Sequence, residues 1–178
     1  MKTKNIAVLV SGGGTNLQAI IDAYKAGKIT NGKLALVLSS NEKAYALERA
    51  ANNGIESCVI KKGADREAFS DAILAKLEEK DIDIIVLSCF MHILIGKIID
   101  RYTNKILNVH PALIPSFCGE GFYGLHVHEA ALAKGVKVTG ATVHFVNEIA
   151  DGGPIILQKA VYRNMNCYEI NNITRTAQ

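Results

Sequence analysis

A regular alternation of short apolar runs with longer amphipathic stretches constrains the fold of this chain most. The first run, residues 5–10 (NIAVLV), is continuous, apolar and rich in β-branched side chains, which is typical of a strand buried on both faces of a parallel sheet. It stops at a serine and three glycines, after which Leu17, Ile20, Ile21 and Tyr24 recur at helical spacing. The chain is therefore predicted to open with a strand, a glycine turn and a helix.

The same alternation continues along the rest of the chain. We expect further strands at residues 33–39, 56–60, 83–88, 105–109, 139–146 and 154–160, and further helices at residues 44–53, 66–80, 93–102 and 126–134. Strands that alternate with helices in this way indicate βαβ units. The prediction is an α/β fold, with a doubly wound, mostly parallel sheet of about seven strands and helices on both faces.

Length and composition limit the class of protein. A chain of 178 residues fits one domain, and 49% hydrophobic with 21% charged residues is typical of a globular protein. Its 20 basic residues are scattered among 17 acidic ones, and its longest apolar runs are far short of the ~20 residues that span a membrane. The four cysteines have no paired spacing and no signal peptide precedes the first strand. We expect a reduced, cytoplasmic protein that binds neither nucleic acid nor membranes.

Ligands of open α/β sheets bind beyond the carboxyl ends of the strands, which directs attention to the glycine loop at residues 11–16. A dinucleotide fingerprint would need glycine at position 17, which is leucine, and the lysine of a P-loop is missing. A phosphate could instead bind the free N–H groups at the helix start, over Gly12, Gly13, Gly14, Thr15 and Asn16. The alternative is a tight turn in which Thr15 or Asn16 caps the helix.

A second polar segment, Asn108-Val109-His110-Pro111, ends the fifth expected strand. Residues two apart in a strand point to the same side, so Asn108 and His110 can face one pocket. Asparagine donates a hydrogen bond to a developing oxyanion, and histidine exchanges protons near neutral pH. A nearby carboxylate would keep the imidazole protonated and oriented. Asp151, in a glycine-bounded loop before the last strand, is the candidate for that carboxylate.

Other readings of these residues remain open at this point. The Asn-x-His pair can serve as a strand cap, and an Asp before Gly-Gly is commonly a turn residue. Two histidine sets could also be proposed as metal ligands, namely His110, His144 and Asp151, or His126 and His128 with Cys118. The first set would require His110 to lose its proton, so no metal is expected.

At these positions the sequence resembles the folate-dependent formyltransferases, and among them the phosphoribosylglycinamide formyltransferases of purine biosynthesis. The resemblance runs from the first strand to about residue 161 and lies in SGGGTNLQAII (11–21), LERA (47–50), REAF (66–69), FMHIL (90–94), LNVHPALIPSF (107–117), GATVHFV (140–146) and DGGPIILQ (151–158). The Asn-x-His-Pro and Asp-Gly-Gly-Pro segments are shared across the folate-dependent family. The glycine-Thr-Asn-Leu-Gln opening is specific to the glycinamide ribonucleotide branch.

The resemblance implies a Rossmann-like formyltransferase fold and a reaction. The amine of glycinamide ribonucleotide would attack the formyl carbon of 10-formyltetrahydrofolate, a cosubstrate, while Asn108 and protonated His110 stabilise the oxyanion. Asp151 would hold His110 protonated and help to move the proton, with His144 in support. The glycine loop would bind the substrate phosphate. The folate would contact Arg66, Met91, His92, Ile93, Leu94 and Asn108.

The sequence also departs from the family pattern. His92 stands where many members have arginine, and residues 118–123 form a longer loop than usual. From about residue 162 the chain matches poorly, so we expect an atypical or truncated tail without the glutamate that contacts the substrate ribose.

Sibling activities are the main competing hypotheses. A 10-formyltetrahydrofolate hydrolase would carry an amino-terminal regulatory domain, for which a first strand at residue 5 leaves no room. A methionyl-tRNA formyltransferase would need a carboxy-terminal domain and a basic surface. A non-catalytic relative that binds folate or phosphate is the third alternative, and the presence of Asn108, His110 and Asp151 argues against it. We expect small-molecule substrates and a monomer or homodimer.

Overall fold

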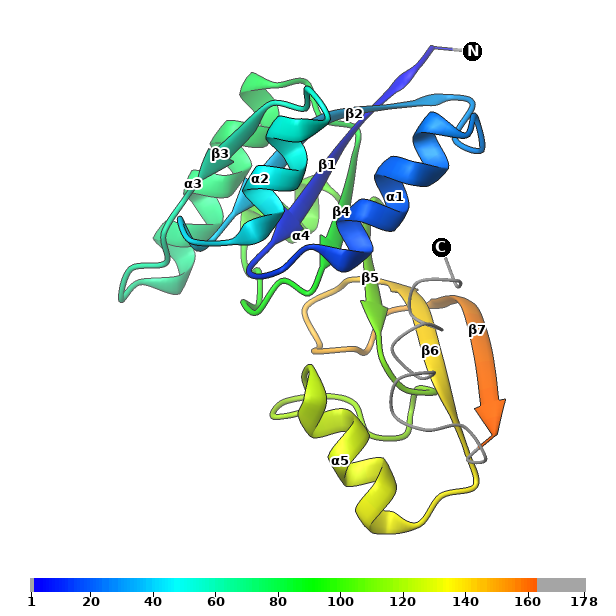
Figure 1. Ribbon diagram of the computed structural model, residues 1–178. Coiled ribbons are helices and arrows are strands. Elements are labelled where there is room, and N and C mark those ends of the chain that lie inside the picture. Colours follow the sequence, from blue (N-terminus) through cyan, green and yellow to red (C-terminus); the bar gives the residue numbers. More distant parts are fainter. Residues whose placement is uncertain (1, 163–178) are drawn as a thin grey trace. The chain divides into compact units, whose positions relative to one another are not determined.

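Strands and helices alternate along the computed structural model, which describes residues 2–162 (Figure 1). The strands are β1 (Lys4–Val10), β2 (Gly32–Ser39), β3 (Ser57–Val59), β4 (Ile84–Ser88), β5 (Ile106–His110), β6 (Val138–Phe145) and β7 (Ile155–Tyr162). The helices are α1 (Thr15–Lys25), α2 (Tyr45–Asn52), α3 (Arg66–Glu79), α4 (Lys97–Arg101) and α5 (Leu125–Lys134).

The strands form one sheet in the order β3-β2-β1-β4-β5-β6-β7. β1 pairs in parallel with both β2 and β4, and β2 pairs in parallel with β3, whereas β6 and β7 are antiparallel. The strand order reverses between β1 and β4, which makes the carboxyl ends of these two strands the expected ligand-binding edge. The predicted α/β fold with a mostly parallel, doubly wound sheet is confirmed.

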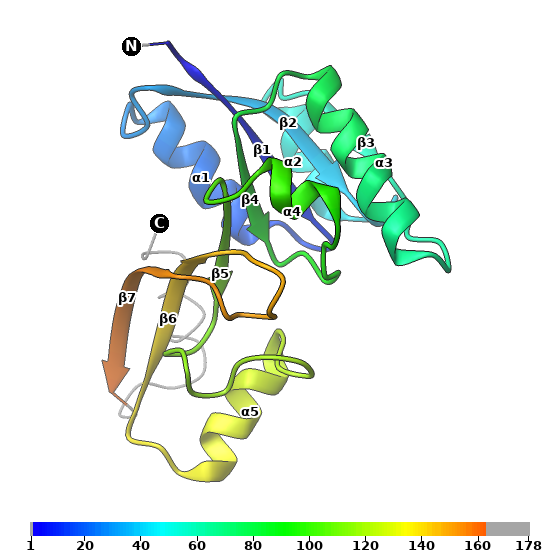
Figure 2. The same ribbon diagram turned by 180° about the vertical axis from the view of Figure 1, so that it is seen from behind.

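Alternating side chains of β1 explain how the sheet is covered. Ile6, Val8 and Val10 point to the side on which α1 and α2 pack, and they join the apolar side chains of those helices in one core cluster. Ala7 and Leu9 point the other way and are equally buried. The pair α3 and α4 packs together on the opposite face from α1 and α2, as the two opposite views show (Figures 1 and 2).

Contacts divide the chain into two compact units at the Leu107–Asn108 junction. The amino-terminal unit contains β1 to β4 and helices α1 to α4, and the carboxy-terminal unit contains α5, β6 and β7. The prediction of a single domain stays a prediction. None of the helices within residues 2–162 is long and apolar enough to cross a membrane.

The first residue of one helix was predicted wrongly. We expected a helix over residues 93–102, but α4 begins at Lys97, after Gly96 with φ 72° and ψ −144°. Before it, the N–H of Ile95 donates to the Ser70 hydroxyl at 3.1 Å instead of entering a helix. Leu94 is buried although it is not helical, so its apolar character reflected packing and not helical periodicity.

Candidate active site

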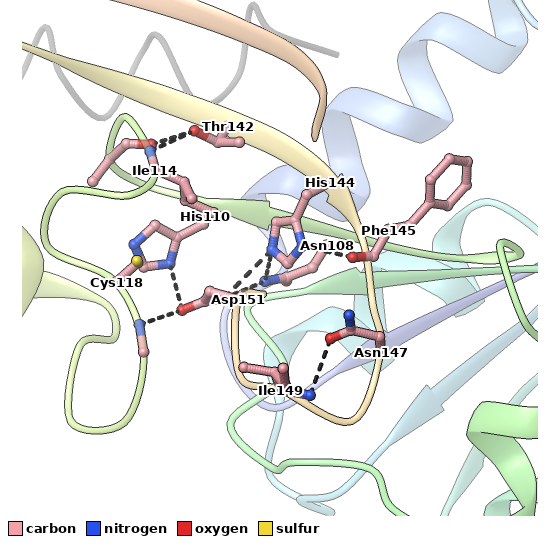
Figure 3. A network of polar contacts seen from close by, with 12 residues as sticks. Asn108, His110, Ile114, Cys118, Thr142, His144, Phe145, Asn147, Ile149 and Asp151 are labelled. Carbon is pink, nitrogen blue, oxygen red and sulfur yellow. Dashed lines mark hydrogen bonds and ion pairs between the residues drawn. The ribbon is translucent and has the colours of Figure 1, made fainter. Parts of the chain in front are cut away.

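Four polar side chains gather in the carboxy-terminal unit (Figure 3). Asn108 and His110 come from β5, His144 comes from β6, and Asp151 comes from the turn that joins β6 to β7. His110 and His144 are almost completely buried, and the Asp151 side chain is 13% exposed. The predicted placement of Asn108 and His110 on one side of the strand is confirmed, because both contact the same carboxylate.

Asp151 lies at the centre of the cluster and uses both carboxylate oxygens. Its Oδ2 lies 3.4 Å from Nδ1 of His110 and accepts a 2.9 Å hydrogen bond from the Gly119 N–H. Its Oδ1 lies 3.4 Å from both Nδ2 of Asn108 and Nε2 of His144. The carboxylate therefore joins three side chains that sequence spacing alone does not bring together.

The turn that carries Asp151 depends on the glycines after it. Asp151 has φ 54°, a left-handed conformation that aspartate tolerates better than most residues. A Cβ on Gly153 would lie 1.8 Å from the Phe145 carbonyl oxygen, so only glycine fits there. The Phe145 N–H donates to the Pro154 carbonyl at 2.9 Å, which closes the turn. Asp151 is thus a turn residue and a site residue at once.

The two nitrogens of His110 both face acceptors. Nε2 donates to the Phe117 carbonyl at 2.8 Å, and Nδ1 faces the Asp151 carboxylate. A carbonyl and an ionised carboxylate can only accept, so both are satisfied when each ring nitrogen carries a proton. The surroundings of His110 therefore suit the imidazolium form.

His144 orients Asn108. Nδ1 of His144 donates to the carbonyl of Phe145 at 2.8 Å, which fixes the ring with Nε2 toward Asn108 and Asp151. Nδ2 of Asn108 lies 3.2 Å from that Nε2 and 3.4 Å from Oδ1 of Asp151. The Asn108 amide is thereby held between His144 and Asp151.

Opposing influences act on the Asp151 carboxyl. Burial raises its pKa, but the hydrogen bond from His144, the hydrogen bond from the Gly119 N–H and the positive charges of His110 and His144 lower it. The lowering influences prevail, and the pKa of Asp151 lies below its usual value. Asp151 is therefore ionised at neutral pH.

Sequence reasoning missed two members of this cluster, Phe117 and Gly119. Both act through backbone groups, a carbonyl on His110 and an N–H on Asp151, so no side-chain pattern reports them. Their positive φ angles of 52° and 89° turn the loop toward the two side chains. A glycine at position 119 was the one available signal, because glycine favours such backbone.

Thr142 anchors the segment that follows His110. Its hydroxyl donates to the Ala112 carbonyl at 2.6 Å and accepts from the Ile114 N–H at 3.1 Å. Gln158 of β7 donates to the same hydroxyl at 3.0 Å. The path of the chain from β5 toward Phe117 is therefore fixed on β6 and β7.

The glycine loop lies in the amino-terminal unit, between β1 and α1. Gly14 is the N-cap residue, with φ 69°, and no side chain caps the helix, so the capping interpretation of Thr15 and Asn16 is wrong. A Cβ on Gly14 would lie 2.6 Å from Cβ of Ala46, which explains the glycine by close packing of α2. The first N–H groups of α1 lack partners within the helix, as in any helix start. The loop has the groups that an anion needs.

The predicted folate segment, residues 91–94, is tied to the glycine loop. The Met91 N–H donates to the Ser11 hydroxyl at 3.0 Å, and that hydroxyl also shares a 2.8 Å hydrogen bond with Ser40. Met91 and Ile93 expose their side chains, whereas Leu94 is buried and could contact a ligand only through its backbone. Ser11 was not predicted as a site residue. It joins the loops that follow β1, β2 and β4.

His92 packs with two phenylalanines and does not project freely. Its ring makes edge contacts with Phe69 at 5.3 Å and with Phe90 at 5.4 Å between centroids. Burial, and then the charge of Lys62, lowers its pKa. Arg66, the first residue of α3, is exposed and lies one turn before Phe69. The structure thus brings Arg66 and His92 to the same end of α3.

No group of three or more metal-ligating side chains is found among residues 2–162. His126, in the second proposed metal set, lies 3.3 Å from Glu129, and His128 is buried with a lowered pKa, caused first by burial and then by the charge of His110. The expectations about the tail, residues 163–178, lie outside the described residues.

Comparison with known proteins identifies the family. The formyl transferase family model matches residues 4–169. The chain is 42% identical to phosphoribosylglycinamide formyltransferase of Escherichia coli over 88% of its own length and 72% of that enzyme. It is 44% identical to the human trifunctional purine biosynthetic protein adenosine-3 over 90% of its own length, but it spans only 15% of that larger protein.

A solved structure agrees. Glycinamide ribonucleotide transformylase 1 from Symbiobacterium toebii superposes with a TM-score of 0.89 at 38% identity, covering 98% of this chain and 82% of that one. The chain belongs to the formyl transferase family, in its phosphoribosylglycinamide formyltransferase branch.

Proposed function

We propose that this protein transfers the formyl group of 10-formyltetrahydrofolate to the amine of glycinamide ribonucleotide. The observation that carries the proposal is the Asp151 carboxylate in contact with both Asn108 and His110. Two hydrogen-bond donors held beside one ionised carboxylate suit acyl transfer to an amine, because the reaction develops an oxyanion and releases a proton. Two of the relatives named above, the enzymes of Escherichia coli and Symbiobacterium toebii, have this activity in their names.

The chemistry follows from the roles of these three side chains. The amine nitrogen attacks the formyl carbon, and the carbonyl oxygen becomes an oxyanion that Asn108 and the His110 imidazolium stabilise. The attacking nitrogen loses a proton, which Asp151 accepts through water. The carbon–nitrogen bond to the folate then breaks, and the folate nitrogen takes up a proton. Formyl glycinamide ribonucleotide and tetrahydrofolate are the products.

The donors must exchange partners before they can act. In this structure Nδ2 of Asn108 already contacts His144 at 3.2 Å and Asp151 at 3.4 Å. Nε2 of His110 donates to the Phe117 carbonyl, so an oxyanion must compete with that carbonyl. We infer that the Phe117 carbonyl holds the imidazolium in place until substrate arrives.

Substrate binding is assigned to the amino-terminal unit. The N–H groups of residues 12–16 suit the phosphate of glycinamide ribonucleotide. Exposed Met91 and Ile93 offer apolar surface to a pterin ring. Arg66 and His92 lie at the same end of α3. The Ser11 hydroxyl links the phosphate loop to residues 91–94, so the two substrates would bind to connected loops. The cytoplasmic location and the oligomeric state stay predictions.

The test is turnover of 10-formyltetrahydrofolate, followed by folate absorbance, with and without glycinamide ribonucleotide. We expect absorbance to change only when the amine is present. Turnover without the amine would instead identify a hydrolase. No turnover in either mixture would contradict the proposal and favour a non-catalytic folate or phosphate-binding protein.

A further inference from the structure

We propose that Arg49 of α2 is a positioning residue, which orients the glycine loop for the substrate phosphate. The inference rests on the proposed function, since it takes residues 12–16 as the phosphate site. Arg49 lies outside the segments predicted to bind either substrate, and the reaction chemistry does not use it.

Two neighbouring carbonyls of the glycine loop are held by α2. Nε of Arg49 donates to the Gly13 carbonyl at 2.9 Å, and the backbone N–H of Ala46 donates to the Gly12 carbonyl at 3.2 Å. A peptide unit is planar and trans, so its N–H points opposite to its carbonyl. The N–H groups of Gly13 and Gly14 therefore point away from α2. Arg49 and Ala46 together set the direction in which the loop can bind an anion.

The Arg49 guanidinium is itself well fixed. Nη1 donates to the side-chain carbonyl of Gln18 in α1 at 3.1 Å, and the guanidinium lies 5.0 Å from the centroid of the Tyr45 ring. The side chain thus connects α2, the loop and the first turns of α1. Its planar fork makes these contacts simultaneously, which the single ammonium of lysine cannot do. Its second terminal nitrogen, Nη2, has no hydrogen-bond partner within the described part of the chain.

The positive charge of Arg49 also favours an anion at the glycine loop. Arg49 donates to the carbonyl of Gly13, the residue before the N-cap Gly14, so its positive charge lies beside the amino-terminal end of α1. A permanent positive charge beside a helix N-terminus strengthens the attraction of the site for a dianion. Arg49 therefore supports phosphate binding in two ways, and the two can be separated by substitution.

The experiment compares Arg49→Gln, which removes the charge and the fork, with Arg49→Lys, which keeps only the charge. Arg101→Gln is the matched control, because Arg101 also lies over a tyrosine ring, that of Tyr102 at 5.7 Å, and also donates to one side chain. Binding of inorganic phosphate is measured by calorimetry. Steady-state kinetics are measured with glycinamide ribonucleotide and with its dephosphorylated riboside.

For Arg49→Gln we expect phosphate affinity and kcat/KM for the ribonucleotide to fall about tenfold, since charge-assisted contacts are about twice as strong as neutral ones. The KM of the folate and the kinetics of the riboside should stay within about twofold of those of the unchanged protein. The phosphate affinity of Arg49→Lys should lie between those of Arg49→Gln and the unchanged protein. Arg101→Gln should match the unchanged protein.

Unchanged phosphate binding in Arg49→Gln would overturn the proposal, as would an equal loss for the ribonucleotide and the riboside, which would indicate a merely structural role. If the unchanged protein binds phosphate but formylates no amine, the proposed function fails. The calorimetric comparison of phosphate binding still decides the role of Arg49 in that case. Absence of phosphate binding by the unchanged protein would overturn the role of Arg49 itself.

Discussion

Replacement of Asp151 by asparagine removes a charge while keeping the shape of the side chain. The amide oxygen can still accept from the Gly119 N–H, which lies at 2.9 Å from Oδ2. The amide nitrogen then takes the place of Oδ1, which lies 3.4 Å from Nε2 of His144 and from Nδ2 of Asn108. The interactions that cannot be kept are the ion pair with His110 and the hydrogen bond from Asn108, because an amide nitrogen does not accept.

The loss should appear in both stability and rate. A hydrogen bond to a charged group contributes about 1.5–3 kcal/mol, so we expect the free energy of unfolding of Asp151→Asn to fall by about 1–3 kcal/mol at pH 7. Without the carboxylate, His110 is no longer held as an imidazolium beside the oxyanion. Loss of one such preorganised donor lowers kcat by about 10²–10³-fold.

The pH dependence follows from the lowered pKa of Asp151. A carboxylate whose folded pKa lies below its unfolded value stabilises the fold above the unfolded pKa, about 3.9 for aspartate, and loses that contribution as pH falls through the folded pKa. The stability difference between the unchanged protein and Asp151→Asn should therefore be present from pH 7 to pH 5 and shrink below about pH 4.

Urea unfolding at several pH values measures this difference directly, and formyl transfer at pH 7 measures the rate. Glu148→Gln, a charge removal in the exposed part of the same loop, serves as the control and should have little effect on stability. Equal stability of Asp151→Asn and the unchanged protein at pH 7, or a difference that persists undiminished at pH 2 to 3, would refute the assigned electrostatics.

Substitutions at three further positions test other parts of the account. Asn108→Ala should lower kcat about 10²–10³-fold with a small change in the KM of the amine, measured by steady-state kinetics, and an unaffected kcat would remove Asn108 from the oxyanion site. Thr142→Val should cost about 1–3 kcal/mol of stability in urea unfolding, because the buried Ala112 carbonyl loses its 2.6 Å donor; a neutral effect would mean that the loop is held otherwise. Asp65→Ala should cost about 0.5–2 kcal/mol, because Asp65 caps α3 through two backbone N–H groups, whereas Asp65→Asn should retain most of that stability.

The elements that could be predicted from sequence are those whose pattern is local. The strand at residues 4–10 and the same-side placement of Asn108 and His110 follow from alternation along an extended chain, which needs no tertiary information. The start of α4 was placed four residues too early, because the burial of Leu94 in non-helical backbone imitates helical spacing.

Contacts between distant segments could not be predicted in this way. Asp151 was joined to His110 only by family resemblance, because the turn that brings them together depends on the Phe145 backbone closing over Gly153. Phe117 and Gly119 were missed because they contribute backbone groups, and Ser11 because a lone serine after a strand has no distinctive spacing. Backbone donors and acceptors become visible only when the path of the loop is known.

Transfer of a ¹³C-labelled formyl group is the most direct test of the central claim, that Asn108, His110 and Asp151 pass a formyl group to an amine. The label is followed by NMR after mixing the protein with labelled 10-formyltetrahydrofolate and glycinamide ribonucleotide, beside His110→Ala as the inactive control. The account predicts that the label appears on the amine nitrogen of the ribonucleotide with the unchanged protein and stays on the folate with His110→Ala. Label released as formate, or transferred equally well by His110→Ala, would contradict it.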